Sequence, residues 1–247
     1  MPFFIRFSFL LVLLVGCNKA NELTFEPVLF QDQACETCTK VSIARPKALG
    51  KSVMAATINT AVDQQIISAL SFNGDKEPES ITDAISTFKN NHGQMKAQQM
   101  AVHQPWQAAI EATVIYEDTT HLTIKMKTDV FTGGAHAHKT TSFLNFDKKK
   151  GKKLTPGELF ADEIGFKTFA ETKFREQEAI PEGKPINHTG LMFESDLFYL
   201  PDNIGYTSEG IRLLYNPYEV ASFADGAITL TLPYAEVKHF LVGKTKS

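Results

Sequence analysis

Apolar residues recur with a helical period in the first third of the chain. Between residues 49 and 70 they share one helix face, at positions 53, 58, 62, 66, 69 and 70. A second stripe of Ile81, Ile85 and Phe88 follows Ser80, a residue type that commonly begins helices. The pattern predicts one helix within 49–70 and another from 81 to the Asn-Asn-His-Gly segment 90–93, both packed on a sheet.

The period then changes to two. Apolar and polar residues alternate over 106–116 and 122–126, and 140–146 is expected to form a third strand. We expect an antiparallel meander with one solvated face. The segment 147–153 that follows carries five lysines. It is either a contact for an anionic polymer or phospholipid, or a solvated hairpin turn whose lysines keep a strand edge from aggregating. We favour the turn, because five lysines in one loop do not make a basic domain.

The remaining signals are local. Residues 155–158 (Thr-Pro-Gly-Glu) have the form of a capping box, and the phenylalanine stripe over 166–174 predicts a helix after it. The stretch 18–33 shows no period and is expected to be a tether. Further strands are expected at 41–43 (ending before Pro46), 198–200, 211–215 and 228–232, with a closing helix from Pro233.

Composition and charge narrow the function classes. The chain has 247 residues, of which 43% are apolar and 21% charged, which argues against a disordered, collagen-like or coiled-coil protein. The net charge is -3, so there is no basic excess to neutralise phosphates and nucleic-acid binding is not expected. The chain has no G-x-S-x-G, no H-E-x-x-H and no complete phosphate loop. We therefore assign no catalytic residue and expect no cofactor.

The N-terminus has the features of a lipoprotein signal. Arg6 precedes an apolar run over 7–15, which is shorter than the ~20 residues of a transmembrane helix and typical of a secretory signal. The run ends Leu-Val-Gly-Cys17, which resembles the bacterial lipobox; the alternative is an ordinary signal peptide that contains a cysteine. We expect residues 1–16 to be removed and Cys17 to be lipidated, which anchors the chain outside the cytoplasm. Asn18 favours the outer membrane where the host has one.

Two further cysteines, Cys35 and Cys38, form a C-x-x-C pair. In an oxidising envelope they are expected to form a disulfide. The alternatives are a redox pair, which needs a helix N-terminus at the first cysteine, and a zinc half-site, which needs two more ligands. The extended pattern of the following residues and the lack of a second C-x-x-C favour the disulfide.

The segment 132–138 (Thr-Gly-Gly-Ala-His-Ala-His) carries the most chemistry. Gly133 and Gly134 allow a positive φ or the close approach of a ligand, and His136 and His138 would project to the same side of a strand. The residues favour a structural turn with a histidine bonded to the backbone. The alternatives are a weak ligand-binding site for glycan or protein, and a metal pair. Because no third ligand is identifiable, no metal is predicted.

Several motifs taken in order resemble the extracytoplasmic PdaC/RsiV-like domain family. The likeness covers about residues 31–242. The motifs that carry it are Ile58-Asn59, Phe131-Thr-Gly-Gly-Ala-His136, Asn145-Phe-Asp147, Leu154-Thr-Pro-Gly-Glu-Leu-Phe160, Leu214-Tyr-Asn-Pro-Tyr-Glu-Val220, Ala224-Asp-Gly226 and Leu232-Pro-Tyr234. The family includes the sensing domain of a lysozyme-responsive anti-sigma factor and the non-catalytic N-terminal region of a peptidoglycan deacetylase.

The resemblance implies an α+β fold, with antiparallel sheets, packed helices and two adjoining subdomains. We accordingly expect a signal peptide at 1–16, the lipidated cysteine and tether at 17–33, an N-terminal α+β domain at 34–150 and a C-terminal α+β domain at 151–247.

Anti-sigma and deacetylase activities do not carry over. Apart from the short run over 7–15, no apolar stretch approaches membrane length, and the chain has no Thr-Phe-Asp-Asp and no H-x-x-x-H motif. What the resemblance implies is a lipid-anchored cell-envelope binding module, on the periplasmic or surface side. Its partner would be a cell-wall component such as peptidoglycan, or a wall-acting protein such as lysozyme. The alternatives are an uncharacterised envelope hydrolase that acts on a wall glycan and a passive partner in an envelope complex.

Overall fold

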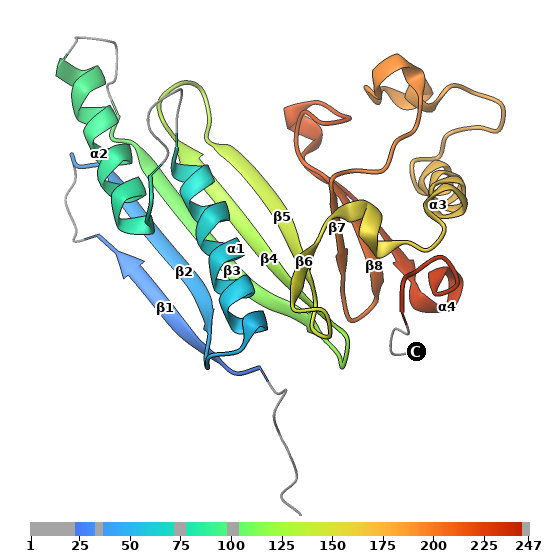
Figure 1. The fold of residues 1–247 in the computed structure, drawn as a ribbon. Helices are drawn as coiled ribbons and strands as arrows, with labels where there is room; N and C mark the ends of the chain where they lie inside the picture. The colour runs from blue at the N-terminus through green and yellow to red at the C-terminus, as the bar shows by residue number, and fades with distance from the viewer. Residues whose placement is uncertain (1–22, 33–36, 72–77, 98–103, 244–247) are drawn as a thin grey trace, which may run out of the picture.

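The computed structural model describes residues 23–32, 37–71, 78–97 and 104–243, which form two sheets and their covering helices (Figure 1). The larger sheet has the strand order β1-β2-β3-β4-β5-β6 and the smaller one β7-β8-β9. The strands of the larger sheet are β1 (Phe25–Gln31), β2 (Lys40–Ala48), β3 (Gln107–Glu117), β4 (His121–Phe131), β5 (His138–Asp147) and β6 (Lys152–Leu154). This confirms the predicted α+β class and the β3-β4-β5 meander.

One pair of strands departs from the expected antiparallel arrangement. β2 and β3 run parallel, with Val41 opposite Ala108 and Ile43 opposite Ile110. Parallel neighbours need a crossover connection. Here helices α1 (Val53–Leu70) and α2 (Ile81–Ala97) lie between β2 and β3 in sequence.

The two helices cover one face of the larger sheet (Figure 1). Ser52 caps α1 by accepting a hydrogen bond from the Ala55 N–H at 3.1 Å. Apolar side chains of α1 and α2, such as Ile58 and Phe88, share one core with Leu122 and Ile124 of β4. Most of the periodic positions of the sequence therefore lie in or against this core, whereas Val53 at the start of α1 is 73% exposed.

Helix α2 continues past Gly93, where the sequence predicts a break. The helix runs to Ala97, and its residue His92, just before the glycine, makes tertiary contacts. Its Nδ1 lies 2.8 Å from the Thr39 hydroxyl, and its ring centre is 5.7 Å from that of Trp106. A glycine inside a helix costs about 1 kcal/mol relative to alanine, which such contacts offset.

The expected tether contains a strand, and the strand expected at 41–43 is longer. β1 pairs with β2 along its length, and Pro27 lies opposite Pro46. The pairing of β2 with β3 ends at Ala44. Beyond that residue β2 has a neighbour only on the β1 side, so a proline is tolerated there as on an edge strand.

The smaller sheet consists of β7 (Asn203–Tyr206), β8 (Gly210–Tyr215) and β9 (Ile228–Pro233). It packs with helices α3 (Glu163–Gln177) and α4 (Tyr234–Val237) around a second core rich in aromatic rings. Short 3-10 helices occur at η1 (Pro156–Leu159), η2 (Ile186–Thr189), η3 (Glu194–Asp196) and η4 (Phe223–Asp225). The predicted capping box of Thr155 and Glu158 is formed at η1.

Residues 198–200 are not a strand, contrary to the prediction. The Phe198 ring packs 5.5 Å from that of Phe174 and 5.6 Å from that of Phe193. The Tyr199 carbonyl accepts a hydrogen bond from the Tyr215 hydroxyl. Ring packing of Phe198 and the hydrogen bond from the Tyr215 hydroxyl therefore fix this segment, in place of hydrogen bonds to a neighbouring strand.

The smaller sheet meets the larger one on the face turned away from α1 and α2. Asn145 of β5 donates to the Ile204 carbonyl of β7 at 2.7 Å and accepts from the Thr123 hydroxyl at 2.8 Å. The His121 ring stacks on Tyr206 at 4.5 Å. The contact is thus a buried layer of polar and aromatic side chains. The expected boundary between residues 150 and 151 falls in the turn between β5 and β6, and β6 belongs to the larger sheet.

Candidate functional site

A groove crosses the part of the larger sheet that the smaller sheet leaves open. Two rows of residues, in register across five strands, face it. One row is Leu29, Ala44, Glu111, Lys127 and Thr141, and the next is Gln31, Ser42, Ala109, Asp129 and Lys139. The cavity above them measures about 650 Å³. We call it the open-face groove.

Small side chains make the floor of the groove. Ser42, Ala44 and Ala109 stand between positions whose side chains point to the opposite, helix-covered face, such as Ile43 and Ile110. Because serine and alanine extend little above the backbone, the centre of the sheet stays hollow. Leu29 of β1, 77% exposed, stands at one side of this floor.

The opposite wall comes from the smaller subdomain, through Asn216, Pro217 and Ala227. The Asn216 side chain accepts from the Thr141 N–H at 2.8 Å and donates to the Thr141 carbonyl at 3.1 Å. β6 pairs only with residues 145–147 of β5, so the edge of β5 at Thr141 lacks a neighbouring strand and Asn216 substitutes for one. These two bonds fix the wall to the sheet.

Charges of both signs line the groove. Asp129 and Lys139 form an ion pair of 3.0 Å, and Glu111 lies opposite Lys127 in the ladder. A second cavity of about 770 Å³ shares the Gln31, Ser42, Ala109, Asp129 and Lys139 row with the first. It extends the groove towards Lys40 and Phe131. A ligand in this groove would meet an apolar floor and paired charges.

The predicted segment 132–138 lies beside the far end of this extension. Gly133 and Gly134 both have positive φ, 99° and 96°, as a structural turn requires. His136 stacks on Phe223 with ring centres 3.9 Å apart, and its Nε2 lies 3.3 Å from the Tyr218 hydroxyl. The turn therefore contacts the loops that follow β8.

The two predicted histidines lie in different elements. His136 is in the turn, and His138 is the first residue of β5. A small cavity of about 100 Å³ has both histidines in its lining, with Pro217 and Tyr218. Across the described ranges, no three His, Cys, Asp or Glu side chains come close enough together to hold a metal ion.

The remaining predicted positions fall mostly outside the structure. Cys17 and Cys35 lie outside the described residues, while Cys38 stands two positions before β2. Lipidation of Cys17 and the Cys35–Cys38 disulfide stay predictions. None of the helices within the described ranges has the length and apolar character needed to cross a bilayer.

The residues that build the groove were not singled out by the sequence pattern. Ala44 and Ala109 carry no reactive group, and Asn216 is visible in the sequence only as part of a turn. The one signal was the Asn-Pro-Tyr-Glu segment 216–219 among the family-like motifs. Its asparagine connects the two subdomains at the groove.

Comparisons with known proteins agree with this architecture. A family model described as deacetylase PdaC matches residues 33–139, and one described as a protein of unknown function, DUF3298, matches residues 155–235. A DUF3298 family protein from Pseudomonas aeruginosa PAO1 has the same fold, with 17% identity and a TM-score of 0.68. A DUF3298 family member from Bacteroides fragilis NCTC 9343 does too, with 15% identity and a TM-score of 0.69. Each alignment covers 90% of this chain and 95% of the other.

No curated protein matches the chain. The two families indicate an extracytoplasmic domain of uncertain function. They match consecutive parts of the chain, and the shared fold spans both, which confirms the resemblance predicted from the motifs. The chain therefore carries a PdaC/DUF3298-like domain.

Proposed function

We propose that this chain is a lipid-anchored binding module of the cell envelope, and that its ligand is an extended segment of a cell-wall polymer held in the open-face groove. The observation that carries the proposal is the groove itself. It is floored by small residues, runs across five strands and is closed on one side by the second subdomain.

The size of the groove favours a polymer segment over a folded protein. Cavities of 300–1,000 Å³ are typical of sites for small molecules and cofactors, and the groove measures about 650 Å³. A stable protein–protein interface instead buries about 800 Å² on each partner over a broad surface. A lysozyme-like partner therefore fits this site less well than a piece of its substrate does.

The charges suit a wall component that carries both signs. Peptidoglycan stem peptides present carboxylates and amino groups on an uncharged glycan. Lys127 and Lys139 can pair with the first, and Glu111 and Asp129 with the second. All four groups lie in the wet part of the site, so each ion pair contributes weakly and is screened by salt.

The described residues give less support to the alternative that the chain is a hydrolase. A general acid is expected to be a carboxyl group in the site with its pKa raised. Two carboxyl groups, Asp63 and Glu219, have raised pKa values because of partial burial, and neither lines the groove. Asp63 lies on α1 and pairs with Arg45 at 3.1 Å.

The test is calorimetric titration of the chain with soluble muropeptides and with lysozyme, at ~50 and ~200 mM salt. We expect heat with muropeptides, weaker at the higher salt. Ala109→Trp, which fills the floor, should abolish binding. Ala56→Trp is the matched control, since Ala56 is exposed on α1 and distant from the groove lining.

Three results would contradict the proposal. Unchanged binding by Ala109→Trp would place the ligand elsewhere. Release of sugar, acetate or peptide that survives purification and is lost in Glu111→Gln or Asp129→Asn would make the chain a hydrolase. No heat with either partner would favour the passive-partner alternative.

A further inference from the structure

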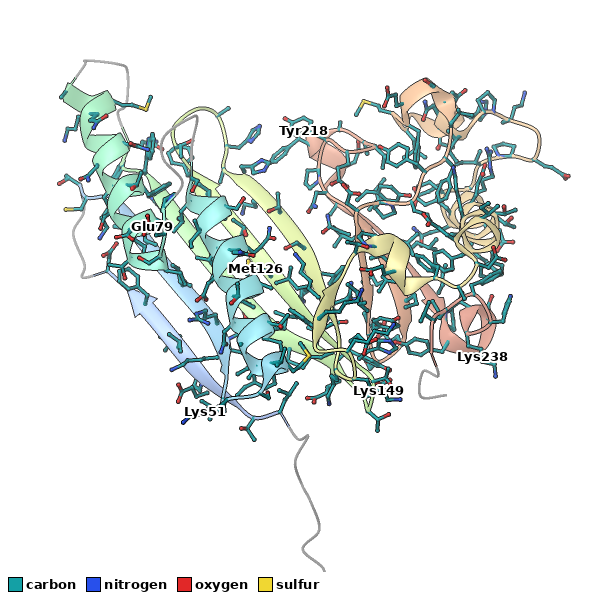
Figure 2. All side chains as sticks on the ribbon, viewed as in Figure 1. Lys51, Glu79, Met126, Lys149, Tyr218 and Lys238 are labelled. Carbon is teal, nitrogen blue, oxygen red and sulfur yellow. The ribbon has the colours of Figure 1, made fainter. Side chains whose placement is uncertain are left out.

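One end of the molecule gathers the start of the described chain and a cluster of lysines. Leu49, after β2, donates to the Thr24 carbonyl just before β1 at 2.8 Å. The Thr57 hydroxyl of α1 donates to the Gly151 carbonyl in the β5–β6 turn at 2.9 Å. Figure 2 shows Lys51 and Lys149 at this same end. We call it the basic end, made of Leu49, Lys51, Val53, Lys149, Lys150, Lys152 and Lys153.

Three of its lysines are not engaged by acids. Lys51, Lys149 and Lys153 are exposed and make no ion pair with any described residue. Lys150 pairs loosely with Asp147 at 3.6 Å, and Lys152 pairs with Glu158. The Lys150 and Lys152 side chains still keep 61% and 47% exposure. The surface is therefore positive although the whole chain is slightly acidic.

Apolar side chains stand among these lysines. Val53, the first residue of α1, is 73% exposed, and Leu49 is 40% exposed. Val53 lies against the lysine turn, since a Cβ placed on Gly151 would be 3.3 Å from its Cγ1 atom. A surface that combines lysines with exposed aliphatic groups matches the headgroup region of a bilayer, which is anionic outside and apolar beneath.

We infer that the basic end rests on a membrane surface that carries anionic phospholipid. The length of chain that precedes the structure supports this occupant. Only residues 18–22 separate Cys17 from Leu23, and at 3.3–3.6 Å per residue they reach about 20 Å at most. A lipid on Cys17 thus holds the basic end near the bilayer, where the field of the lipids extends about 8 Å at physiological salt.

The arrangement also sets the direction of the groove. β5 runs from the glycine turn to the lysine turn over 10 residues, or about 34 Å. Figure 2 shows Tyr218, a neighbour of the glycine turn, at the end opposite Lys149. With the lysines on the lipid, the extension of the groove opens away from the membrane. This inference goes beyond the proposed function; it rests on one part of that proposal, the lipid at Cys17, and not on the groove or its ligand.

The test is hydrogen exchange of the full lipidated chain on vesicles. One population is phosphatidylcholine and the other contains ~30% phosphatidylglycerol, which supplies the anionic surface potential. We expect slower exchange of amides in the 148–153 turn on the anionic vesicles, and loss of the slowing in 0.5 M salt. The exposed segment 182–184 should exchange equally on both.

Charge-reversal variants sharpen the comparison. Lys149→Glu/Lys153→Glu should lower the population of the membrane contact by at least about fivefold for each lysine. Lys96→Glu/Lys184→Glu changes the same charge at exposed sites outside the basic end and should leave the slowing intact. Equal exchange on both vesicle types, or equal loss in both double variants, would overturn the inference. Failure of the chain to attach to either vesicle would also overturn the inference. That result would contradict the lipid anchor at Cys17 and would leave the proposal about the groove unaffected.

Discussion

Replacing Asn145 with alanine tests the polar connection between the two sheets. Asn145 is 3% exposed and bridges Thr123 of β4 and the Ile204 carbonyl of β7. Alanine removes both bonds and leaves the two partners inside the layer between the sheets. Neither partner reaches water there, since Thr123 is 0% and Ile204 1% exposed.

The expected cost follows from these two orphaned groups. A buried polar group left without its partner costs ~1–3 kcal/mol. The Thr123 hydroxyl can rotate towards another acceptor, so its share lies near the lower limit. We expect a loss of about 3 kcal/mol in the free energy of unfolding. For a chain of this size that corresponds to roughly 6–12 °C in melting temperature.

Urea unfolding and thermal melting of three variants provide the measurement. Asn145→Ala and Thr123→Val each remove one side of the bond between them. The double variant should cost ~1 kcal/mol less than the sum, because the unpaired hydroxyl is then absent. Asn90→Ala, at an exposed position of α2, is the control and should stay within ~0.5 kcal/mol of the parent. A cost below ~1 kcal/mol for Asn145→Ala, or strict additivity, would refute the bridging role.

Three further predictions concern single sites. Burial lowers the pKa of His121 from 6.5 despite nearby Asp118. The unfolded chain therefore binds the proton first, and stability should fall as pH drops below about 6.5. In urea unfolding between pH 7.5 and 5.5, His121→Phe should flatten that fall, and an unchanged slope would contradict the assignment. Gly134→Val should cost well over ~1 kcal/mol because φ there is 96°; an unaltered melting temperature would show the backbone to be ordinary. Cys17→Ala should release the chain from the membrane fraction or stop its processing, and normal membrane partitioning with normal maturation would reject the lipid anchor.

The sequence predicts elements well where one face is buried and the other is wet. Helix α1 and strands β3 and β4 fall where the apolar period places them, since each packs one side on the same core. Strand β1 was not predicted, because it does not have one buried and one solvated face. It is an edge strand, its residues are half-buried or exposed, and Pro27 weakens its strand signal. Only its pairing with β2 makes it a strand.

The other errors come from contacts between residues distant in the chain. Gly93 predicts a helix end, but His92 contacts Thr39, 53 positions away. Likewise, Phe198 belongs to a strand-like segment and is instead held in an aromatic cluster by Phe174 and Phe193. Local propensity describes the isolated segment, whereas these structures are decided by the partner that burial supplies.

The candidate site was only partly predictable for the same reason. The glycine turn could be found because only glycine commonly adopts positive φ. The floor of the groove could not be found in this way. Ser42, Ala44 and Ala109 form a common surface only once β2 and β3 are placed side by side in register. A residue whose role is to leave space carries no reactive group, so no sequence motif identifies it.

The face of the larger sheet that is turned away from the helices has two parts. One part packs against the smaller sheet, and the other is exposed to solvent and forms the open-face groove. Phe143 and Asn145 bind the smaller sheet tightly, so that a Cβ on Gly205 would lie 2.7 Å from the Phe143 ring. Glu111 and Lys127, further along the same face, pair opposite charges on a solvated surface. Because small and charged residues resist both collapse and sheet-to-sheet aggregation, the groove can stay open without a bound partner. The rigid contact at Asn145 then holds the wall at Asn216 at a constant height above that floor. A preformed groove of this kind would lose little entropy when the extended polymer segment that we propose as its ligand enters it.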